Sequence, residues 1–164
     1  MEQTDPGKAE RVWSRVMCAQ NIQNVQAACP CKADGSLSGE KLAELANEEL
    51  QSCAFYRSLA CMACGCAQKT LLCIAEQERC HAKKLAVIYF LATGRKFCPS
   101  CPRPACTACL NEALRQAYKE ELEAAQNYCL LAERAGSHAC TLQELARQEK
   151  EHACALACIL QNTL

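Results

Sequence analysis

Glu78-Arg-Cys-His81 and Glu149-Lys-Glu-His152 are the two stretches of this chain that decide its fold. Each places a carboxylate and an imidazole three residues apart, which on a helix puts both on one face about one turn apart. Each also interrupts an apolar row at the place where an ordinary bundle helix carries leucine. A single Glu-x-x-His is typical of a solvated helix face, but two in register indicate a shared site.

Apolar residues at steps of three and four define four helical segments around these motifs. The expected helices cover about 39–62, about 67–93, about 108–135 and the residues from Thr141 onward. Their inward rows are Leu42, Leu45, Glu49, Ser52, Tyr56 and Leu59; Leu71, Ile74, Glu78, His81, Leu85, Ile88 and Ala92; Leu114, Ala117, Glu121, Ala124, Tyr128 and Leu131; and Leu142, Leu145, Glu149, His152, Leu156 and Ile159. The pattern predicts an all-α protein.

Capping and breaking residues mark the expected helix ends. Ser38 is a favourable N-cap for the first helix, and Gly65 is expected to end it. Gly94 suits a C-terminal cap of the second helix, and Gly136 is expected to end the third. Thr141-x-x-Glu144 reads as a capping box that begins the fourth.

The connections between these helices have unequal lengths. Short links join the first helix to the second and the third to the fourth, whereas the Pro/Cys-rich residues 95–107 form a longer connection. The sequence therefore predicts a four-helix bundle over residues 39–164, with a crossover between the second and third core helices. Residues 1–38 are expected to form a short N-terminal helical arm, amphipathic over 9–28, followed by a loop.

Six acidic and imidazole side chains fall within the inward rows at mid-length. They are Glu49, Glu78, His81, Glu121, Glu149 and His152. A buried carboxylate without a partner costs several kcal/mol, so the convergence of these groups in one layer requires cations. Metal ions are the simplest source of that positive charge.

The two halves of the bundle repeat the same pattern. Glu49 precedes Glu78 by 29 residues, and Glu121 precedes Glu149 by 28. A tyrosine follows the first glutamate of each half by seven residues, at Tyr56 and at position 128. The chain therefore has the pattern of an internal duplication, in which two equivalent hairpins supply four Glu and two His to one site.

This set of motifs resembles the ferritin-like superfamily, and most closely its rubrerythrin branch, over residues 40–162. The resemblance implies a ferritin-like fold with a di-iron centre. The resemblance implies that the carboxylates near or bridging both metals are Glu78 and Glu149, and that the terminal or bridging carboxylates are Glu49 and Glu121. It implies one nitrogen ligand for each metal, from His81 and His152. It also implies that Tyr56 and Tyr128 hydrogen-bond the ligands or quench radicals.

The chain departs from rubrerythrins in two respects. Its C-terminal residues contain no rubredoxin-type four-cysteine iron domain, and Glu121 is followed three residues later by Ala124 rather than by a second glutamate. Glu120 and Glu123 keep the three-residue spacing, so Glu120 is the alternative third-helix ligand. Glu121 is preferred because it matches the first half of the chain.

Oxygen and nitrogen ligands in this mixture suit two iron ions, with manganese or zinc as alternatives. The resemblance implies a redox enzyme that reacts with peroxide or dioxygen and takes electrons from an unidentified donor. A metal-storage or buffering protein is the second hypothesis, with thiol clusters holding copper(I) or zinc. A bundle with a purely structural role is the third.

Seventeen cysteines, an odd number, occur without a recognisable export signal, so most are expected to be reduced. Three clusters stand out: Cys18 with Cys29 and Cys31; Cys53 with Cys61, Cys64 and Cys66; and Cys98, Cys101, Cys106 and Cys109. The last contains two C-x-x-C knuckles that could bind zinc or iron tetrahedrally. Plain burial or disulfides are the alternatives for all three.

Cys73, Cys80, Cys154 and Cys158 are expected on helix faces turned away from the Glu/His rows. That argues against a copper-storage bundle with a thiol core. We expect these four cysteines to contact the N-terminal arm or to lie at a homodimer interface.

Lys plus Arg equals Asp plus Glu at 18 each, so no nucleic-acid or membrane partner is expected. The expected location is the cytoplasm.

Overall fold

The computed structural model describes residues 37–102 and 109–163, and all of its regular structure is helical. The helices are α2 (Gly39–Met62), α3 (Gly65–Thr93), α4 (Leu110–Ala132) and α5 (Ala139–Thr163), with a 3₁₀ turn η1 (Gly136–His138) before α5. Four helices of the lengths expected from the sequence confirm an all-α bundle. The predicted N-terminal arm lies outside the described residues.

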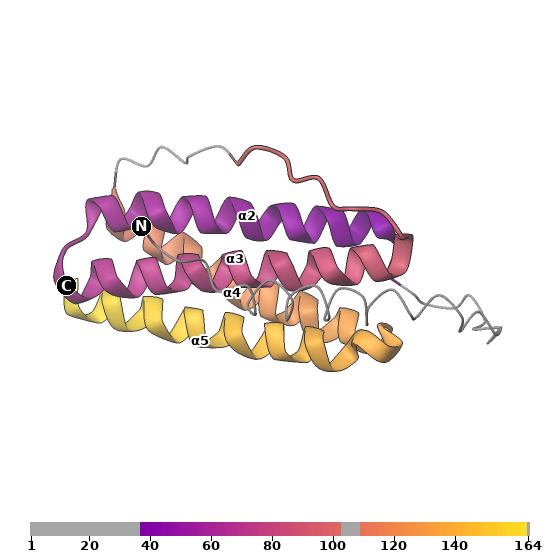
Figure 1. The fold of residues 1–164 in the computed structure, drawn as a ribbon. Coiled ribbons are helices and arrows are strands. Elements are labelled where there is room, and N and C mark those ends of the chain that lie inside the picture. Colours follow the sequence, from indigo (N-terminus) through magenta and orange to yellow (C-terminus); the bar gives the residue numbers. More distant parts are fainter. Residues whose placement is uncertain (1–36, 103–108, 164) are drawn as a thin grey trace, which may run out of the picture. The chain divides into compact units, whose positions relative to one another are not determined.

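The helices form two antiparallel hairpins, α2 with α3 and α4 with α5 (Figure 1). The described part of the connection after α3 runs back along α2, so α4 starts at the same end of the bundle as α3 (Figure 1). Ser100 fixes this connection to α2, because its backbone N–H and its hydroxyl both donate to Oδ1 of Asn47, at 2.9 and 3.0 Å. The expected long crossover is therefore present.

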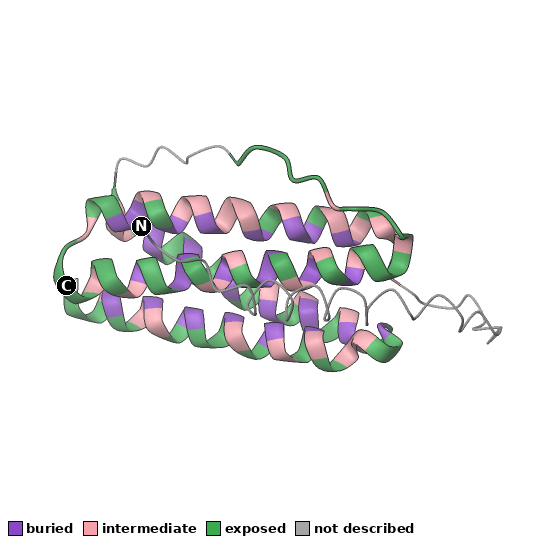
Figure 2. Ribbon diagram, viewed as in Figure 1, coloured by how far each residue is buried: buried purple, intermediate pink, exposed green. Residues whose placement is uncertain are grey.

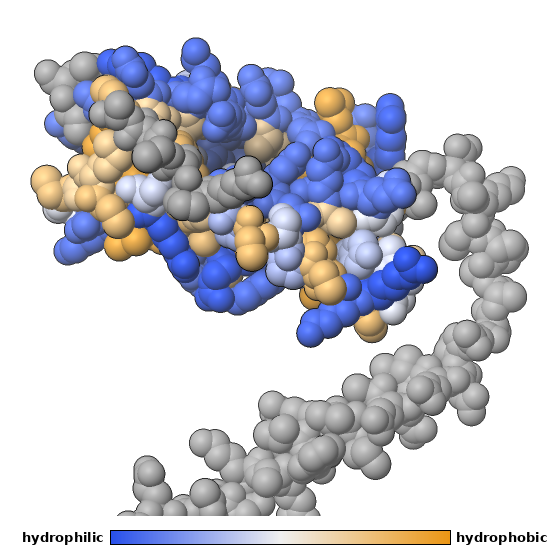
Figure 3. All heavy atoms as spheres, turned by 90° about the horizontal axis from the view of Figure 1, so that it is seen from above, coloured by the Kyte–Doolittle hydropathy of each residue, from blue (hydrophilic) through white to orange (hydrophobic). Residues whose placement is uncertain are grey.

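Buried residues recur along the inner side of every helix, and exposed residues cover the outer side (Figure 2). Hydrophilic side chains cover much of the face shown in Figure 3, with hydrophobic groups among them. In two of the predicted rows the buried residue is the next one along: Cys53 rather than Ser52, Ala125 rather than Ala124, and Ala132 rather than Leu131. Ala92, which was predicted to face inward at the end of the second helix, is exposed. Within the described residues, none of the helices combines the length and apolarity that crossing a membrane requires.

Two of the predicted helix ends are confirmed, at Ser38 and Gly94, and two are wrong. Gly136 does not end α4, which already ends at Ala132; it begins η1. Ser38 is the N-cap of α2, and Gly94 caps α3 with a φ of 69° and an N–H that donates to the Phe90 carbonyl. The capping box predicted at Thr141 is wrong: α5 begins two residues earlier, at Ala139. The η1 turn has already wound the chain into a helical path at that point, so Thr141 lies inside the first turn.

The Ser38 cap leads to a stability prediction. Its hydroxyl accepts a hydrogen bond from the N–H of Lys41 at 3.1 Å, satisfying one of the four free donors at the start of α2. Ser38→Ala should lower the free energy of unfolding by about 1 kcal/mol. Ser58→Ala, within the same helix, is the control and should change it by less than about 0.5 kcal/mol. Urea unfolding followed by circular dichroism measures both, and equal losses would contradict the capping role.

Candidate metal centre

The middle of the bundle contains a layer of six buried charged or imidazole groups. Each of them is at most 6% exposed: Glu49, Glu78, His81, Glu121, Glu149 and His152. One apolar cluster, which includes Leu71 and Leu156, lies on one side of this layer, and a second, which includes Leu85 and Leu145, lies on the other. The apolar clusters shield the layer from water along the length of the bundle, which strengthens the electrostatic interactions within it.

The six side chains form two overlapping groups, each with ligand atoms within 4.8 Å of one another. The first, here called the His81 half-site, consists of Glu49, Glu78, His81 and Glu149. The second, the His152 half-site, consists of Glu78, Glu121, Glu149 and His152. Glu78 and Glu149 belong to both. The structure therefore brings together all six residues that the sequence predicted as bundle ligands, and the site could hold metal ions.

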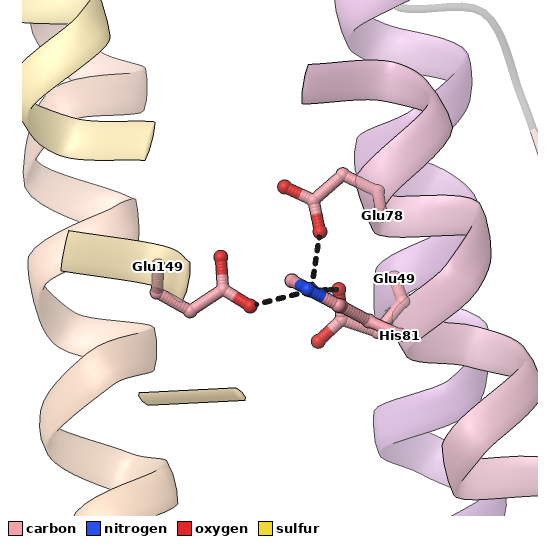
Figure 4. A group of neighbouring side chains, drawn as sticks. All are labelled: Glu49, Glu78, His81 and Glu149. Atoms are coloured by element: carbon pink, nitrogen blue, oxygen red, sulfur yellow. Dashed lines mark ion pairs between the residues drawn. The ribbon is translucent and has the colours of Figure 1, made fainter. Parts of the chain in front are cut away.

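Three carboxylates surround one ring nitrogen in the His81 half-site (Figure 4). Nδ1 of His81 lies 2.8 Å from Glu149 Oε1, 3.2 Å from Glu78 Oε2 and 3.5 Å from Glu49 Oε2. An imidazole nitrogen can donate to only one of these oxygens. The crowding of acceptors on a single nitrogen is the arrangement expected around a shared cation.

The His152 half-site repeats this geometry. Nδ1 of His152 lies 3.0 Å from Glu78 Oε1, 3.0 Å from Glu149 Oε2 and 3.5 Å from Glu121 Oε2. The two half-sites thus exchange the roles of Glu78 and Glu149, as a twofold relation between the hairpins requires. The rings of His81 and His152 stack with their centroids 5.5 Å apart.

Three buried atoms of the layer have no hydrogen-bond partner. They are Glu78 Oε1, His81 Nδ1 and Glu149 Oε1. His81 Nδ1 and Glu149 Oε1 are 2.8 Å apart, which is within ion-pair distance, but their orientation does not form a hydrogen bond. Leaving a buried polar group unsatisfied costs about 1–3 kcal/mol, and more for a charged one. Metal coordination would satisfy all three atoms, so the residues present fit a bound cation.

Each histidine presents its other nitrogen to a glutamine on the opposite hairpin. His81 Nε2 lies 3.0 Å from Oε1 of Gln148, and His152 Nε2 lies 3.0 Å from Oε1 of Gln77. The Gln148 oxygen also accepts from Nζ of Lys84 at 3.1 Å, and a lysine can only donate, so this atom is an acceptor. The histidines therefore donate through Nε2, and a metal that displaces the Nδ1 proton would find a lone pair on that nitrogen.

The two glutamines were not singled out from the sequence, although a signal was present. Gln77 directly precedes Glu78, and Gln148 directly precedes Glu149, so the repeated motif is Gln-Glu-x-x-His. A glutamine one position from an inward residue looks like an ordinary polar side chain at the edge of a helix face. Its role depends on the neighbouring hairpin, which periodicity within one helix cannot reveal.

The tyrosines of the two halves also reach across. The hydroxyl of Tyr56, on α2, donates to Oε1 of Glu121 on α4, and that of Tyr128 donates to Oε1 of Glu49. Both rings are almost fully buried. The expectation that these tyrosines hydrogen-bond the predicted ligands agrees with the geometry, and their role in catalysis stays a prediction.

Without a metal, the histidines are the only cations within the layer. Burial favours their neutral forms, but the three carboxylates around each Nδ1 favour the charged form more strongly. They raise the pKa of His81 to about 12 and that of His152 to about 11.

The four carboxylates divide into two pairs. Burial raises the pKa of Glu49 well above its ordinary value and that of Glu121 to about 8. Burial opposes ionisation of Glu78 and Glu149 as well, but the positive charge of the two neighbouring histidines favours it more strongly. They lower the pKa of Glu78, and they lower that of Glu149 to about 2.

A cavity of about 540 Å³ gives access to this layer. Its walls include the buried Glu49, Glu78, Glu121 and Glu149, both buried tyrosines, and residues of α2 and α4 nearer the surface. Three exposed glutamates also line it: Glu48, Glu120 and Glu123. A small molecule or a metal ion could reach the carboxylates by this path.

The structure distinguishes between the two candidate ligands on α4. Glu121 is buried and belongs to the His152 half-site. Glu120 is exposed and accepts a hydrogen bond from the side chain of Gln116 at 2.9 Å. Helix register therefore directs Glu121 inward, which is the alternative preferred from the sequence.

The predicted thiol sites are not assembled within the described residues. There, the two Glu/His half-sites are the groups that bring three or more potential ligand atoms within 4.8 Å. Cys98, Cys101 and Cys109 are exposed, and Cys106 lies outside the described residues, so a metal knuckle at these four cysteines stays a prediction. The cluster of Cys18, Cys29 and Cys31 also lies outside them.

The outer-face cysteines are exposed, as the helical angles predicted: Cys73, Cys80, Cys154 and Cys158. Cys53 differs, because it is 5% exposed and packs into the apolar cluster around Leu71. The described thiols therefore lie apart from the charged layer.

Fold and site together define a class: an all-α four-helix bundle with a buried layer of carboxylates and imidazoles that could hold metal ions. A solved structure of a hypothetical protein from Pyrococcus furiosus has the same fold, with a TM-score of 0.66 and 22% identity over 82% of this chain and 95% of that chain. No family model and no curated protein matches the chain. The structural likeness shows the fold alone.

Proposed function

We propose that the chain is a ferritin-like, rubrerythrin-like di-metal carboxylate protein that reacts with peroxide or dioxygen. The observation that carries the proposal is the pair of half-sites that share Glu78 and Glu149. Four carboxylates and two imidazoles in a water-poor layer match two divalent cations in charge. Ligands of this kind favour iron or manganese and also accept zinc.

Two bound iron(II) ions would supply the two electrons that, with two protons, reduce one hydrogen peroxide to two water molecules. The chain's own residues account for access and orientation. The cavity between α2 and α4 admits a molecule of this size to the carboxylates. The apolar clusters on both sides of the layer exclude water from the rest of the site.

The tyrosines hold the terminal carboxylates in place. Tyr56 keeps its phenolic proton on Oη, where it bonds Glu121, because burial and that carboxylate raise its pKa well above the ordinary value. Tyr128 does the same beside Glu49. Each phenol is thus a proton and electron reserve next to a ligand. Re-reduction of the metal would require an outside electron donor.

Anaerobic loading with iron(II), followed by hydrogen peroxide, tests this proposal. The expected result is rapid oxidation of about two iron(II) per chain by one peroxide, seen as a growing near-ultraviolet absorbance. Thiols would be alkylated beforehand, so that cysteine oxidation does not consume the peroxide. Oxidation no faster than that of free iron(II) would contradict the proposed reaction.

Metal buffering is the second candidate, and it rests on the exposed thiols. A separate cavity of about 740 Å³ is lined by Met62, Cys64, Cys66 and Cys158, the soft donors that copper(I) prefers. Titration with copper(I) against a competing chelator tests it. Tight binding of several copper ions, together with no peroxide turnover by the iron-loaded protein, would favour the buffer over the enzyme.

The acidic cavity wall leads to a kinetic prediction. Converting Glu48, Glu120 and Glu123 together to glutamine should slow uptake of divalent cations about tenfold at low salt, because these charges attract cations to the entrance. Equilibrium affinity should change little, since none of the three contacts the ions. Stopped-flow mixing with manganese(II) measures the rate.

A second triple variant controls for net charge. Glu40, Glu112 and Glu133 are exposed and do not line this cavity, so converting them to glutamine removes the same charge elsewhere. Equal slowing in both variants would show that only net charge matters and would contradict the cavity as the route of entry.

A further inference from the structure

The two half-sites match closely in their ligands. In the His81 half-site, the histidine Nδ1 lies 3.2 Å from the carboxylate on its own helix and 2.8 Å from the shared carboxylate of the opposite hairpin. In the His152 half-site, both of these distances are 3.0 Å. The distance to the third carboxylate is 3.5 Å in both. A tyrosine bonds the third carboxylate in each case. The two sets of ligands are therefore nearly equivalent in composition and in distance.

The symmetry fails one step further from the ligands. Gln148, which bonds His81, also accepts a hydrogen bond from the ammonium of Lys84 at 3.1 Å. Lys84 follows His81 by three residues, and the residue three after His152 is Ala155. The side-chain oxygen of Gln77 forms a hydrogen bond with His152. Within residues 37–102 and 109–163, no lysine or arginine donates a hydrogen bond to Gln77.

This difference acts on the histidines as ligands. A strong acceptor at Nε2–H makes the opposite nitrogen a better electron donor to a metal. The Lys84 ammonium draws electron density from the shared Gln148 oxygen, which weakens that oxygen as an acceptor for His81. Lys84 also adds a positive charge on the His81 side, in a half-buried position where water screens it incompletely.

We propose that Lys84 makes the two half-sites inequivalent, so that a divalent cation fills the His152 half-site before the His81 half-site. Lys84 is a positioning residue that acts through Gln148. The inference rests on the metal centre proposed above and adds an order of filling to it. The expected difference in affinity is about tenfold, the lower end of what outer partners of metal ligands contribute.

Crystals of the full chain grown with one equivalent of manganese(II) test the order directly. Anomalous scattering should show the ion predominantly at the His152 half-site, with about threefold lower occupancy at the other, because one equivalent shared between two independent sites of tenfold different affinity fills about three quarters of the tighter and one quarter of the weaker. Calorimetric titration with manganese(II) should resolve two stepwise affinities that differ about tenfold. Manganese is chosen because thiolates compete for it poorly.

Three variants separate the charge of Lys84 from its bulk. Lys84→Met should bring the two occupancies close to equality, whereas Lys84→Arg, which keeps the charge and a donor, should preserve the wild-type order. Lys83→Met removes an exposed charge from the adjacent position and should also preserve it.

The outcomes distinguish this inference from the metal centre itself. Equal occupancy in the wild type, preference for the His81 half-site, or an unchanged ratio in Lys84→Met would overturn the inference and leave the centre standing. Absence of manganese from both half-sites at saturating concentration would overturn the centre as well.

Discussion

Glu78→Ala is expected to weaken binding of both metal ions by at least about 100-fold, because this carboxylate belongs to both half-sites. Loss of an outer partner of a ligand already costs 10–100-fold, so loss of a shared ligand should cost more. Glu49→Ala should weaken metal binding at the His81 half-site far more than at the His152 half-site, because Glu49 belongs only to the former. Calorimetry with manganese(II) measures both affinities.

The control lies two residues away on α3. Glu76 is exposed and pairs with Arg79 on the helix surface, so Glu76→Ala should bind two ions as the wild type does. Far-ultraviolet circular dichroism establishes that each variant is folded. Two ions bound with unchanged affinity by Glu78→Ala would rule out the shared-ligand arrangement.

Metal loading is expected to release about four protons per chain at pH 7. In the metal-free protein, His81 and His152 keep a second proton because their pKa values are about 12 and about 11. Glu121, with a pKa of about 8, and Glu49 also hold protons. Two divalent cations would replace these four protons and leave the total charge of the layer unchanged.

The sign of the pH dependence follows from this exchange. Raising the pH lowers the number of protons that the metal must displace, first at Glu121 as the pH passes about 8. Apparent affinity should therefore rise from pH 6 to pH 9. Calorimetry in buffers of different ionisation enthalpy counts the protons. Affinity that falls over this range, or metal binding without proton release, would contradict the charge assignment.

Helical periodicity was sufficient to predict the bundle and its charged layer. Each of the six polar residues occupies a position where a leucine would otherwise be buried, so burial of Glu49 or Glu78 follows from register within a single helix. The crossover likewise followed from the length of chain between Thr93 and Leu110. These features depend on local sequence, which a single chain displays directly.

Contacts between hairpins could not be obtained in this way. The bonds from His81 to Gln148 and from His152 to Gln77 join residues more than sixty positions apart, and neither glutamine stands out from its neighbours. The start of α5 was also misplaced, because a 3₁₀ turn extends the helix before Thr141. Both differences arise from packing or local geometry that residue type alone does not encode.

Native mass spectrometry of protein purified anaerobically without added metal tests the central claim most directly. Thiols should be alkylated first, so that cysteine-bound ions are lost. We expect that two metal ions per chain remain, and that they disappear in Glu78→Ala but persist in Glu76→Ala. Protein that retains no metal after alkylation, and binds none when iron(II) or manganese(II) is supplied, would contradict it.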